Sequence, residues 1–512
     1  MDWPAHPVDP RYVSFALDWW PPDKGCEPYG WGSHANVLDV DLKSPQLIAF
    51  TKALGPSILR IGGTLEKVVE YDIPEEGLHC IPESKSPCLN TSRWRDLHDF
   101  AVKTNCKIVF GLSYPQSQDG RWNATQATAL LRYSQRHNLS RATTLHAVEL
   151  GEEMSRFAVG TRDFDLYTAA YHECANLLKS IWEDEPAAKP LLVGPSPGMR
   201  WPRLATWFPA FLNATTGALE AAVYHSYNQI EPGKLYLNFT IPSGNLSTQQ
   251  GSSPGDTGWQ AEAMNNFVRS HNNRHKDSPN LFLWLDEFGP HNHGGGTGNI
   301  SASFASSFGY LDTLGSLARL NHSMLARQTL VGGRYELLRC STGHAGRCSF
   351  EPYPDYWVAL LWQKLMGTTV LDAPTAKRLS SRGTNHSWIE PFRFHAHCTA
   401  DRDGAVTVAF SNTSPEWVSL DAQELGPTRI EYVLQGYLKA NAHGSGFNTS
   451  VVKLNGSVLR VGKDSTHLPP LKGRTSSNLP DSPFMIPPIS LGFLVFAQAM
   501  APACSSHVAQ EA

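Results

Sequence analysis

Two short acidic segments contain the side chains that are best suited to chemistry. They read VELGEEMSRF over residues 148–157 and LFLWLDEFG over residues 281–289. In the first an apolar run leads into Glu152 and Glu153, and in the second it leads into Glu287. Two facing carboxyl groups can divide acid–base work, because one protonates a leaving oxygen while the other attacks or activates water. This division of work is typical of glycoside hydrolysis.

Strand alternation separates the glutamates of the first segment. Side chains point to opposite faces along a strand, so Glu149 and Glu153 are predicted to face the interior and Glu152 to face away. Glu149 lies roughly 13 Å deeper than Glu153, where a charge needs a buried partner, and Arg60 is the candidate. Glu153 is therefore the predicted acid at the rim. The competing interpretation of any single Glu at a strand end is a helix cap or a solvated side chain.

Eight short apolar segments alternate with amphipathic stretches over the first 375 residues. They cover residues 12–18, 57–63, 106–114, 146–153, 190–198, 221–227, 281–289 and 325–333. Eight strand and helix units in series predict an α/β fold, a (β/α)8 TIM barrel, which holds its reactive groups at the C-terminal ends of the strands. A helix over residues 357–367, opened by Asp355 and closed by Gly367, is predicted to complete the barrel.

The pattern changes after about residue 375 to strands and turns without helices. This predicts a C-terminal β-sandwich. The predicted domains are a catalytic barrel at residues 1–375 and a sandwich at residues 376–512, with the option that N-terminal residues add a strand to the sandwich.

Composition excludes several classes of protein. Hydrophobic residues at 41% and charged residues at 18% describe a globular chain, not a disordered or fibrous one. The net charge of −4 gives no general attraction to nucleic acid or anionic membranes. No apolar run approaches the ~18 residues of a membrane span. A monomer that binds no nucleic acid is expected.

Asparagine frames and cysteines indicate the secretory pathway. Twelve Asn-x-Ser/Thr frames predict N-glycans, at Asn90, Asn123, Asn138, Asn213, Asn238, Asn245, Asn299, Asn321, Asn385, Asn412, Asn448 and Asn455. The first residues lack a signal peptide, so a secreted, cell-wall or vacuolar protein is expected to be shown here trimmed. The predicted disulfides are Cys80–Cys88, Cys340–Cys348 and Cys398–Cys504. Cys174 lies on an apolar helical face and is predicted to be a buried thiol.

Longer motifs resemble a known family of glycosidases. LDWWPPDKG, LRIGGTLEKVVEYD, RQTLVGGRYELL and PDYWVALLWQKLMGTTVL look like glycoside hydrolase family 79 of clan A, particularly its plant heparanase-like and β-glucuronidase members. The resemblance runs from about residue 12 to the APACS segment that ends at residue 505. It implies a retaining hydrolase that cleaves β-linked glucuronic acid by a two-glutamate double displacement, with no cofactor and no metal.

The resemblance also implies roles for single residues. Glu153 would be the general acid/base, and Glu287 the nucleophile that forms a covalent glucuronyl-enzyme. Tyr227 matches a tyrosine that hydrogen-bonds the nucleophile. The other implied substrate-binding positions are Asp18, Thr64, Glu152, Gly294, Gly295, Gln328, Gly333 and Tyr335. Among these groups, a Tyr hydroxyl and backbone N–H groups are neutral donors, and such donors can hold a sugar carboxylate without a metal.

Glu152 departs from the family pattern, in which an Asn usually donates to the sugar 2-hydroxyl. A carboxylate donates only when it is protonated, and a second negative charge beside Glu153 is predicted to raise the pKa of that acid. An alternative function is therefore a glycan-binding protein with impaired catalysis on the same fold.

The expected partner is a glucuronic-acid-containing glycan or a small-molecule glucuronide, cleaved in endo or exo fashion. A metal-dependent hydrolase is a weaker alternative. The His-x-His pairs at residues 291–293 and 395–397 do not follow the first barrel strand, where such an enzyme carries them.

Overall fold

The computed structural model describes most of the 512-residue chain. The described residues are 3–19, 35–154, 156–198, 203–227, 257–296, 299–342, 348–372, 392–438, 446–462, 465–479 and 482–505. Cys26 and three of the predicted glycosylation sites, Asn238, Asn245 and Asn385, lie outside them.

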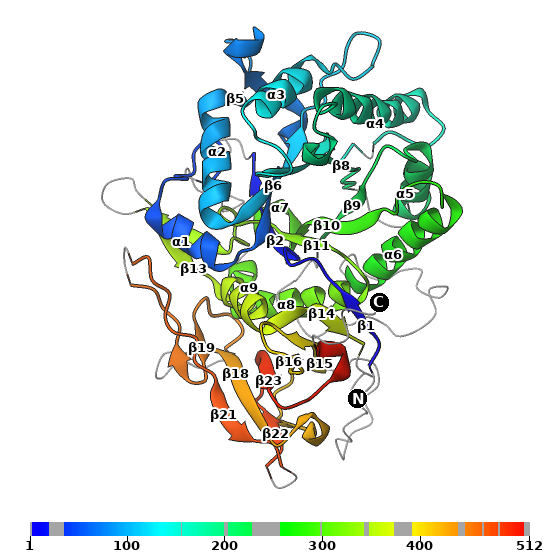
Figure 1. The fold of residues 1–512 in the computed structure, drawn as a ribbon. Helices are drawn as coiled ribbons and strands as arrows, with labels where there is room; N and C mark the ends of the chain where they lie inside the picture. Colours follow the sequence, from blue (N-terminus) through cyan, green and yellow to red (C-terminus); the bar gives the residue numbers. More distant parts are fainter. Residues whose placement is uncertain are drawn as a thin grey trace.

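Eight parallel strands close into a barrel, which occupies the upper part of the molecule in Figure 1. In chain order they are β2 (Val13–Asp18), β3 (Ser57–Gly62), β6 (Cys106–Leu112), β7 (Leu145–Leu150), β8 (Leu191–Gly194), β9 (Ala221–Tyr227), β10 (Phe282–Gly289) and β11 (Met324–Arg327). β11 pairs with β2 and so closes the ring. Each of the eight predicted segments supplies one strand, and the predicted barrel is confirmed.

Helices follow the barrel strands and cover their outer faces. They are α1 (Pro45–Ala53), α2 (Thr91–Thr104), α3 (Thr125–Arg136), α4 (Arg162–Ile181), α5 (Arg203–Ala214), α6 (Thr257–Arg274), α8 (Phe304–Arg319) and α9 (Pro354–Leu365). α2 illustrates the local signals, because the Asn90 side chain accepts from the Arg93 N–H at its start and Asn105 ends it in the left-handed conformation. A shared apolar core lies between strands and helices.

The predicted end of the last barrel helix is wrong. α9 begins at Pro354, whose fixed φ suits the first helical turn, and it ends at Leu365. Gly367 lies instead in strand β14 (Met366–Leu371). A Cβ at Gly367 would stand 2.6 Å from the carbonyl oxygen of Cys398, so glycine is needed there for close strand pairing.

The interior of the barrel has an apolar floor. It consists of the buried side chains of Ile58, Val109, Ala147, Leu191, Val193, Ala221, Val223, Trp284, Met324 and Ala326. Two residues further along their strands, the same alternation brings Arg60, Glu149 and Asp286 to the interior. The polar side chains therefore form a layer above the floor, toward the C-terminal ends of the strands.

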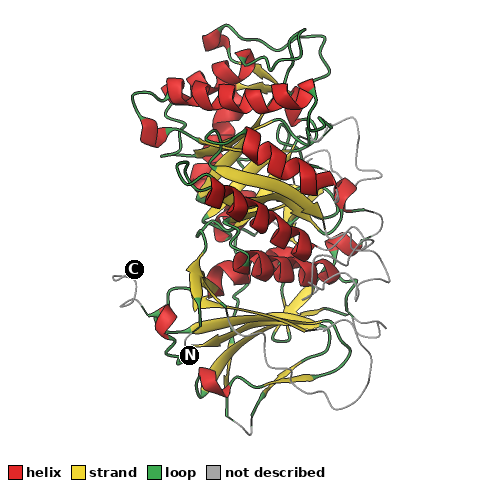
Figure 2. Ribbon diagram, turned by 90° about the vertical axis from the view of Figure 1, so that its right-hand side faces the viewer, coloured by secondary structure: helices red, strands yellow, loops and turns green. Residues whose placement is uncertain are grey.

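A large antiparallel sheet lies beneath the barrel (Figure 2). Its path is β1 (Ala5–Pro7), β14, β15 (Phe392–Thr399), β16 (Val406–Asn412), β23 (Ser490–Phe496), β18 (Thr428–Gly436), β19 (Val452–Leu454) and β20 (Ser457–Val458), and β21 (Arg474–Ser477) also pairs with β18. β1 and β14 belong to this sheet although both precede residue 375. The division at residues 375 and 376 stays a prediction.

Three short pairs complete the strands of the described residues. They are β4 (Glu70–Asp72) with β5 (Cys88–Asn90), β12 (Leu338–Thr342) with β13 (Cys348–Pro352), and β17 (Val418–Leu420) with β22 (Phe484–Ile486). The three predicted disulfides are confirmed. Cys174 is a buried free thiol as predicted, and burial raises its pKa to about 12. None of the described helices combines the length and the apolar character that crossing a bilayer requires.

α8 and α9 lie between the barrel and the sheet, as Figure 1 shows. α8 is buried on all of its sides, because it packs against barrel elements and against β15 and β16. The Nε2 atom of His395 on β15 lies 3.0 Å from Oδ1 of Asp312 on α8. His6 Nε2, near the start of the chain, lies 3.0 Å from the carbonyl oxygen of Ala318 on the same helix.

Candidate active site

Arg60 is the centre of the polar layer. Its guanidinium is fully buried and donates from three nitrogens, each over 2.8 Å: Nε to Glu149, Nη1 to Glu287 and Nη2 to Glu152. Asp286 lies 3.5 Å from Nε. The predicted pairing of Arg60 with Glu149 is confirmed, and the same guanidinium also holds two further carboxyl groups. Buried charges need such partners, because desolvation of an unpaired ion is costly.

Local breaks in strand geometry bring consecutive acids to the same side. The pairing register of β10 with β9 shifts between Leu285 and Glu287, so both Asp286 and Glu287 turn inward. After β7, Gly151 adopts φ +66° and the alternation ends. Glu152 therefore also reaches the interior, where it is 2% exposed. The prediction that Glu152 faces away is wrong, because the strand alternation does not extend past Leu150.

Glu287 and Glu153 face each other across the mouth of the barrel. Tyr227 donates to Oε1 of Glu287 over 2.5 Å, and Arg60 holds its other oxygen. One oxygen each of Glu152, Glu153 and Glu287 and one nitrogen of His225 all lie within 4.8 Å of one another. Carboxyl groups about 5 Å apart suit direct nucleophilic attack, whereas inverting enzymes keep them about 6.5–9.5 Å apart to admit a water.

The Glu153 side chain is the accessible member of this group. It is 41% exposed, and His225 Nδ1 donates to its Oε1 over 3.2 Å. Its backbone has φ +49°, and its N–H donates to the carbonyl oxygen of Ser196. Burial raises the pKa of Glu153, but the hydrogen bond and the charge of His225 outweigh burial and hold that pKa below its usual value. The predicted rise in the pKa of Glu153 is therefore wrong. That prediction considered the negative charge of Glu152 but not the positive charge of His225.

Glu149, Ser196 and Asp286 form a chain of hydrogen bonds below the mouth. The Ser196 hydroxyl lies 2.8 Å from Glu149 Oε2 and 2.7 Å from Asp286 Oδ2. One hydroxyl has one proton, so one of these two carboxyl groups must carry a proton of its own. Burial raises the pKa of Glu149 to about 8. Although burial also disfavours its charge, His225 and Arg60 lower the pKa of Asp286 to about 2, so the proton resides on Glu149.

The predicted sugar-binding residues largely gather beside Glu287. Gln328 donates to Asp18 over 2.6 Å, and both side chains are buried. The Tyr335 ring centre lies 6.5 Å from that of Tyr227. Burial, together with the negative charges of Glu287 and Glu152, raises the pKa of Asp18 well above its usual range.

The predicted glycines lie against one another at this wall. Gly333 has φ +74°, and a Cβ there would approach the carbonyl oxygen of Gly294, which accepts from the Arg334 N–H. Gly295 packs against the backbone of Tyr335. Thr64 is exposed, immediately after Gly63. The structure thus brings the three predicted glycines together beside Tyr335.

Several residues of this layer were not predicted from the sequence. His225 lies two residues before Tyr227 on β9, so strand alternation could have placed both side chains inside. Glu66 is fully buried 3.9 Å from Arg60, and a Cβ at Gly111 would overlap its carboxyl group. Ser196 follows β8 in a left-handed conformation, with φ +49°, for which the sequence carries no clear signal.

The four clustered ligand atoms of Glu152, Glu153, His225 and Glu287 also have the composition of a metal site. Several of these ligand atoms already have partners, however: Arg60 and Tyr227 hold the two oxygens of Glu287. Oε2 of Glu152 accepts from Arg60 and from the Gly63 N–H. A buried guanidinium thus already supplies positive charge to Glu152 and Glu287.

Three histidines of the His-x-His pairs have structural contacts, and the side chain of His293 lies outside the described part of the structure. His395 binds Asp312, whereas His397 Nδ1 donates to the carbonyl oxygen of Gly367 and its ring packs on Trp362. Burial lowers the pKa of His397 to about 4, so it stays neutral. His291 Nδ1 lies 2.8 Å from the carbonyl oxygen of Asn292.

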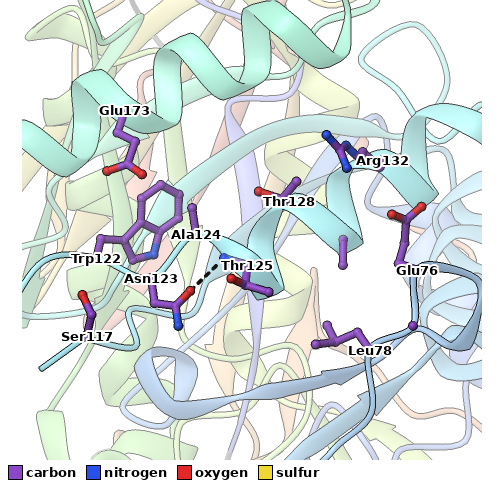
Figure 3. A pocket seen from close by; sticks show the side chains of 12 residues that line it. Glu76, Leu78, Ser117, Trp122, Asn123, Ala124, Thr125, Thr128, Arg132 and Glu173 are labelled. Atoms are coloured by element: carbon purple, nitrogen blue, oxygen red, sulfur yellow. Dashed lines mark hydrogen bonds between the residues drawn. The ribbon is translucent and has the colours of Figure 1, made fainter.

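A separate cavity of about 720 Å³ lies on the outside of the barrel (Figure 3). It is lined by residues of α3, α4 and the preceding loops, among them Glu76, Trp122, Asn123, Arg132 and Glu173. Asn123, a predicted glycosylation site, accepts from the Thr125 N–H at its edge. The carboxyl groups around Arg60 do not contribute to this cavity.

Known proteins resemble the chain in sequence and in fold. Heparanase-like protein 3 of Arabidopsis thaliana is 27% identical to the chain, over 97% of the chain and 92% of its own length. Baicalin-beta-D-glucuronidase of Scutellaria baicalensis is 27% identical over 90% and 84%. The GH51 alpha-L-arabinofuranosidase of Thermotoga petrophila RKU-1 shares the fold, with a TM-score of 0.58 at 13% identity over 96% and 98%. Residues 4–315 match the model of glycosyl hydrolase family 79, N-terminal domain, and the chain therefore belongs to that family.

Proposed function

We propose that the protein is a retaining glycoside hydrolase that cleaves β-linked glucuronic acid. The observation that carries this proposal is the approach of Glu153 and Glu287 within 4.8 Å at the mouth of the barrel. Membership of family 79 and the similarity to baicalin-beta-D-glucuronidase support the choice of sugar.

In the first step Glu287 attacks the anomeric carbon. Tyr227 and Arg60 fix the carboxylate for this attack through one hydrogen bond to each oxygen. The bond to the leaving oxygen breaks, Glu153 gives that oxygen its proton, and a covalent glycosyl-enzyme forms. In the second step Glu153 takes a proton from water, the water oxygen attacks the anomeric carbon, and Glu287 departs.

His225 supports the exchange of roles by Glu153. It holds one oxygen of Glu153, and its other nitrogen lies 3.7 Å from Asp286. Burial lowers the pKa of His225, but the carboxylates of Glu287 and Asp286 raise it well above its usual value. A protonated His225 therefore stabilises the Glu153 anion that remains once the leaving oxygen has taken the proton, and this anion acts as the base in the second step.

Asp18, Gln328 and Tyr335 form the proposed wall of the sugar site. All three are buried beside Glu287, and the amide of Gln328 and the hydroxyl of Tyr335 are neutral donors. Such donors hold a sugar carboxylate at fixed geometry. Gly294, Gly295 and Gly333 let the two segments of this wall pack closely against each other. The substrate is then a glycan that contains glucuronic acid or a small-molecule glucuronide.

Passage through the secretory pathway is also proposed. Seven predicted glycosylation sites have exposed side chains, namely Asn90, Asn123, Asn138, Asn213, Asn299, Asn321 and Asn448. Asn412 is excluded from this set, because its side chain is buried and its Nδ2 donates to the carbonyl oxygens of Glu416 and Pro487. Three disulfides fit an oxidising compartment.

A chromogenic β-glucuronide tests the function, with NMR of the first-formed sugar anomer. Hydrolysis with retained configuration is expected, and Glu287→Gln should abolish it. Glu153→Gln should lose about 10²–10⁴-fold, with the smaller losses on substrates whose leaving group needs no proton. Azide should rescue Glu153→Ala to the β-glycosyl azide and Glu287→Ala to the α-azide. A folded native protein that binds glucuronate without turnover would instead support the glycan-binding alternative.

A further inference from the structure

Glu152 is anchored through one oxygen only. Its Oε2 accepts from Arg60 Nη2 over 2.8 Å and from the Gly63 N–H over 2.6 Å. The other oxygen, Oε1, forms no hydrogen bond with a described residue. It is also absent from the set of fully buried side-chain oxygens and nitrogens that lack a partner. The carboxyl group is thus held in a fixed orientation with one oxygen left for another partner.

The carboxyl group of Glu152 lies beside the proposed catalytic pair, because one of its oxygens is within 4.8 Å of an oxygen of Glu153 and of an oxygen of Glu287. The charged and titratable groups around Glu152 are Arg60 on β3, Asp18 on β2, Glu66 in the 3-10 turn η2 (Glu66–Val68), Glu149 on β7, Glu153, His225 on β9, and Glu287 on β10. Two of these are cations and five are carboxyl groups. The positive charge is shared, because Arg60 also donates to Glu149 and Glu287.

We propose that Glu152 works as a protonated carboxyl group that accepts from Arg60 and Gly63 through Oε2 and donates through Oε1 to a hydroxyl of the bound sugar. A proton on Oε1 leaves both anchoring bonds intact, since these use the other oxygen. The inference rests on the proposed function. Hydrogen bonds to the hydroxyl beside the reacting carbon strengthen in the transition state, so the donor contributes to rate.

Electrostatics agree with the geometry. Burial raises the pKa of Glu152, and the charges of Glu287 and Glu153 raise it further, against the opposing effect of Arg60 and His225. An ionised Glu152 could only accept a hydrogen bond from the sugar hydroxyl and could offer it no proton. The proposed consequence is that kcat/KM falls as pH rises through the titration of Glu152, in addition to any loss from Glu153.

Glu152→Gln separates this titration from the others. Gln keeps an oxygen for Arg60 and Gly63 and places a permanent N–H donor at the position of Oε1. We expect the ratio of kcat/KM, variant over native, to be flat at low pH and to rise about tenfold per pH unit above the titration of Glu152. Glu66→Gln is the matched control, because it removes another buried carboxyl near Arg60 that has no contact with the catalytic pair. Its ratio to native should show no continued tenfold rise per pH unit, because Glu152 still loses its proton in this variant.

A second measurement does not depend on turnover. Calorimetry of glucuronate binding, in buffers of different ionisation enthalpy and at a pH above the titration of Glu152 in the free protein, should show that the native protein takes up about one more proton than Glu152→Gln. Equal proton uptake together with a flat activity ratio would overturn the inference and leave the proposed function intact. Extra proton uptake in a protein that cleaves no β-glucuronide would sustain the inference for binding and refute the hydrolase.

Discussion

At the scale of residues, one guanidinium organises the site. Arg60 donates to Glu149, Glu152 and Glu287, which meet it from two other strands and a loop. One positive charge cannot neutralise three negative ones, so protonation must remove part of the negative charge. Glu149 is the clearest case of a protonated carboxyl group. The one proton of the Ser196 hydroxyl cannot serve both Glu149 and Asp286, so Glu149 supplies the second.

Glu149→Gln should therefore make stability less dependent on pH. Burial raises the pKa of Glu149 from 4.5 in the unfolded chain to about 8 in the fold. The folded state holds this proton more tightly, so the stability it contributes is present below about pH 4.5 and is lost as pH rises through about 8. Gln stays neutral and can still accept from Arg60 and donate to Ser196.

Urea unfolding of native protein and Glu149→Gln between pH 5 and pH 9 measures this effect. We expect the difference in the free energy of unfolding, variant minus native protein, to increase as pH rises. A constant difference across this range would contradict the assignment of the proton to Glu149.

Alternation along strands predicted part of this layer. The pairing of Arg60 with Glu149 followed from depth and from the cost of a buried charge. Glu152 was misplaced because its orientation depends on the backbone of Gly151, whose φ no side-chain pattern encodes. The pKa of Glu153 was misjudged because His225 is distant in sequence and meets it only when the barrel closes.

At the scale of elements, the loop after β8 shapes the space for the acid. Gly198 lies so close that a Cβ there would overlap the carboxyl group of Glu153. A flexible side chain that is 41% exposed can move aside without unfolding the barrel. The loop thus controls the position of Glu153 rather than the stability of the fold.

Gly198→Ala should lower kcat/KM about 10²-fold on substrates whose leaving group needs a proton, because small misplacements of a catalytic group are costly. The loss should be small on an activated aryl glucuronide, and the melting temperature should stay near that of the native protein. Gly462→Ala, where a Cβ meets only Ser465 at 3.7 Å, is the control. Equal losses on both substrates would show that the loop acts on something other than Glu153.

Elements were more predictable than their ends. All eight barrel strands were found because strands covered on both faces are apolar runs. The end of α9 was placed at Gly367 because glycine commonly ends helices, whereas here it permits β14 to approach β15. The bulge at Asp286 and Glu287 could not be predicted, since it is a property of pairing with β9.

At the scale of the whole molecule, the barrel and the antiparallel sheet share α8. Gly315 on this helix faces His395 of β15, and a Cβ at Gly315 would overlap the imidazole ring. The same histidine binds Asp312 one turn earlier. A change at this contact therefore acts on both parts at once.

Gly315→Ala should destabilise the protein by roughly 1–3 kcal/mol, as overpacking of a core does. Because α8 belongs to both parts, we expect one calorimetric transition that moves to lower temperature as a whole. Two transitions, of which only one moves, would show that barrel and sheet unfold independently.

The pairing of β1 with β14 has a consequence for biosynthesis. Ala5 lies opposite Leu371, and β2, next in the chain, closes the barrel only against β11. Both the ring and this edge of the sheet thus join β1 and β2 to strands that are synthesised more than 300 residues later. Such distant pairings are slow to form. Until those residues are made, β1 lacks its partner β14 and β2 is paired on one edge only, with β3. The stage most vulnerable to misfolding therefore precedes the synthesis of β11 and β14.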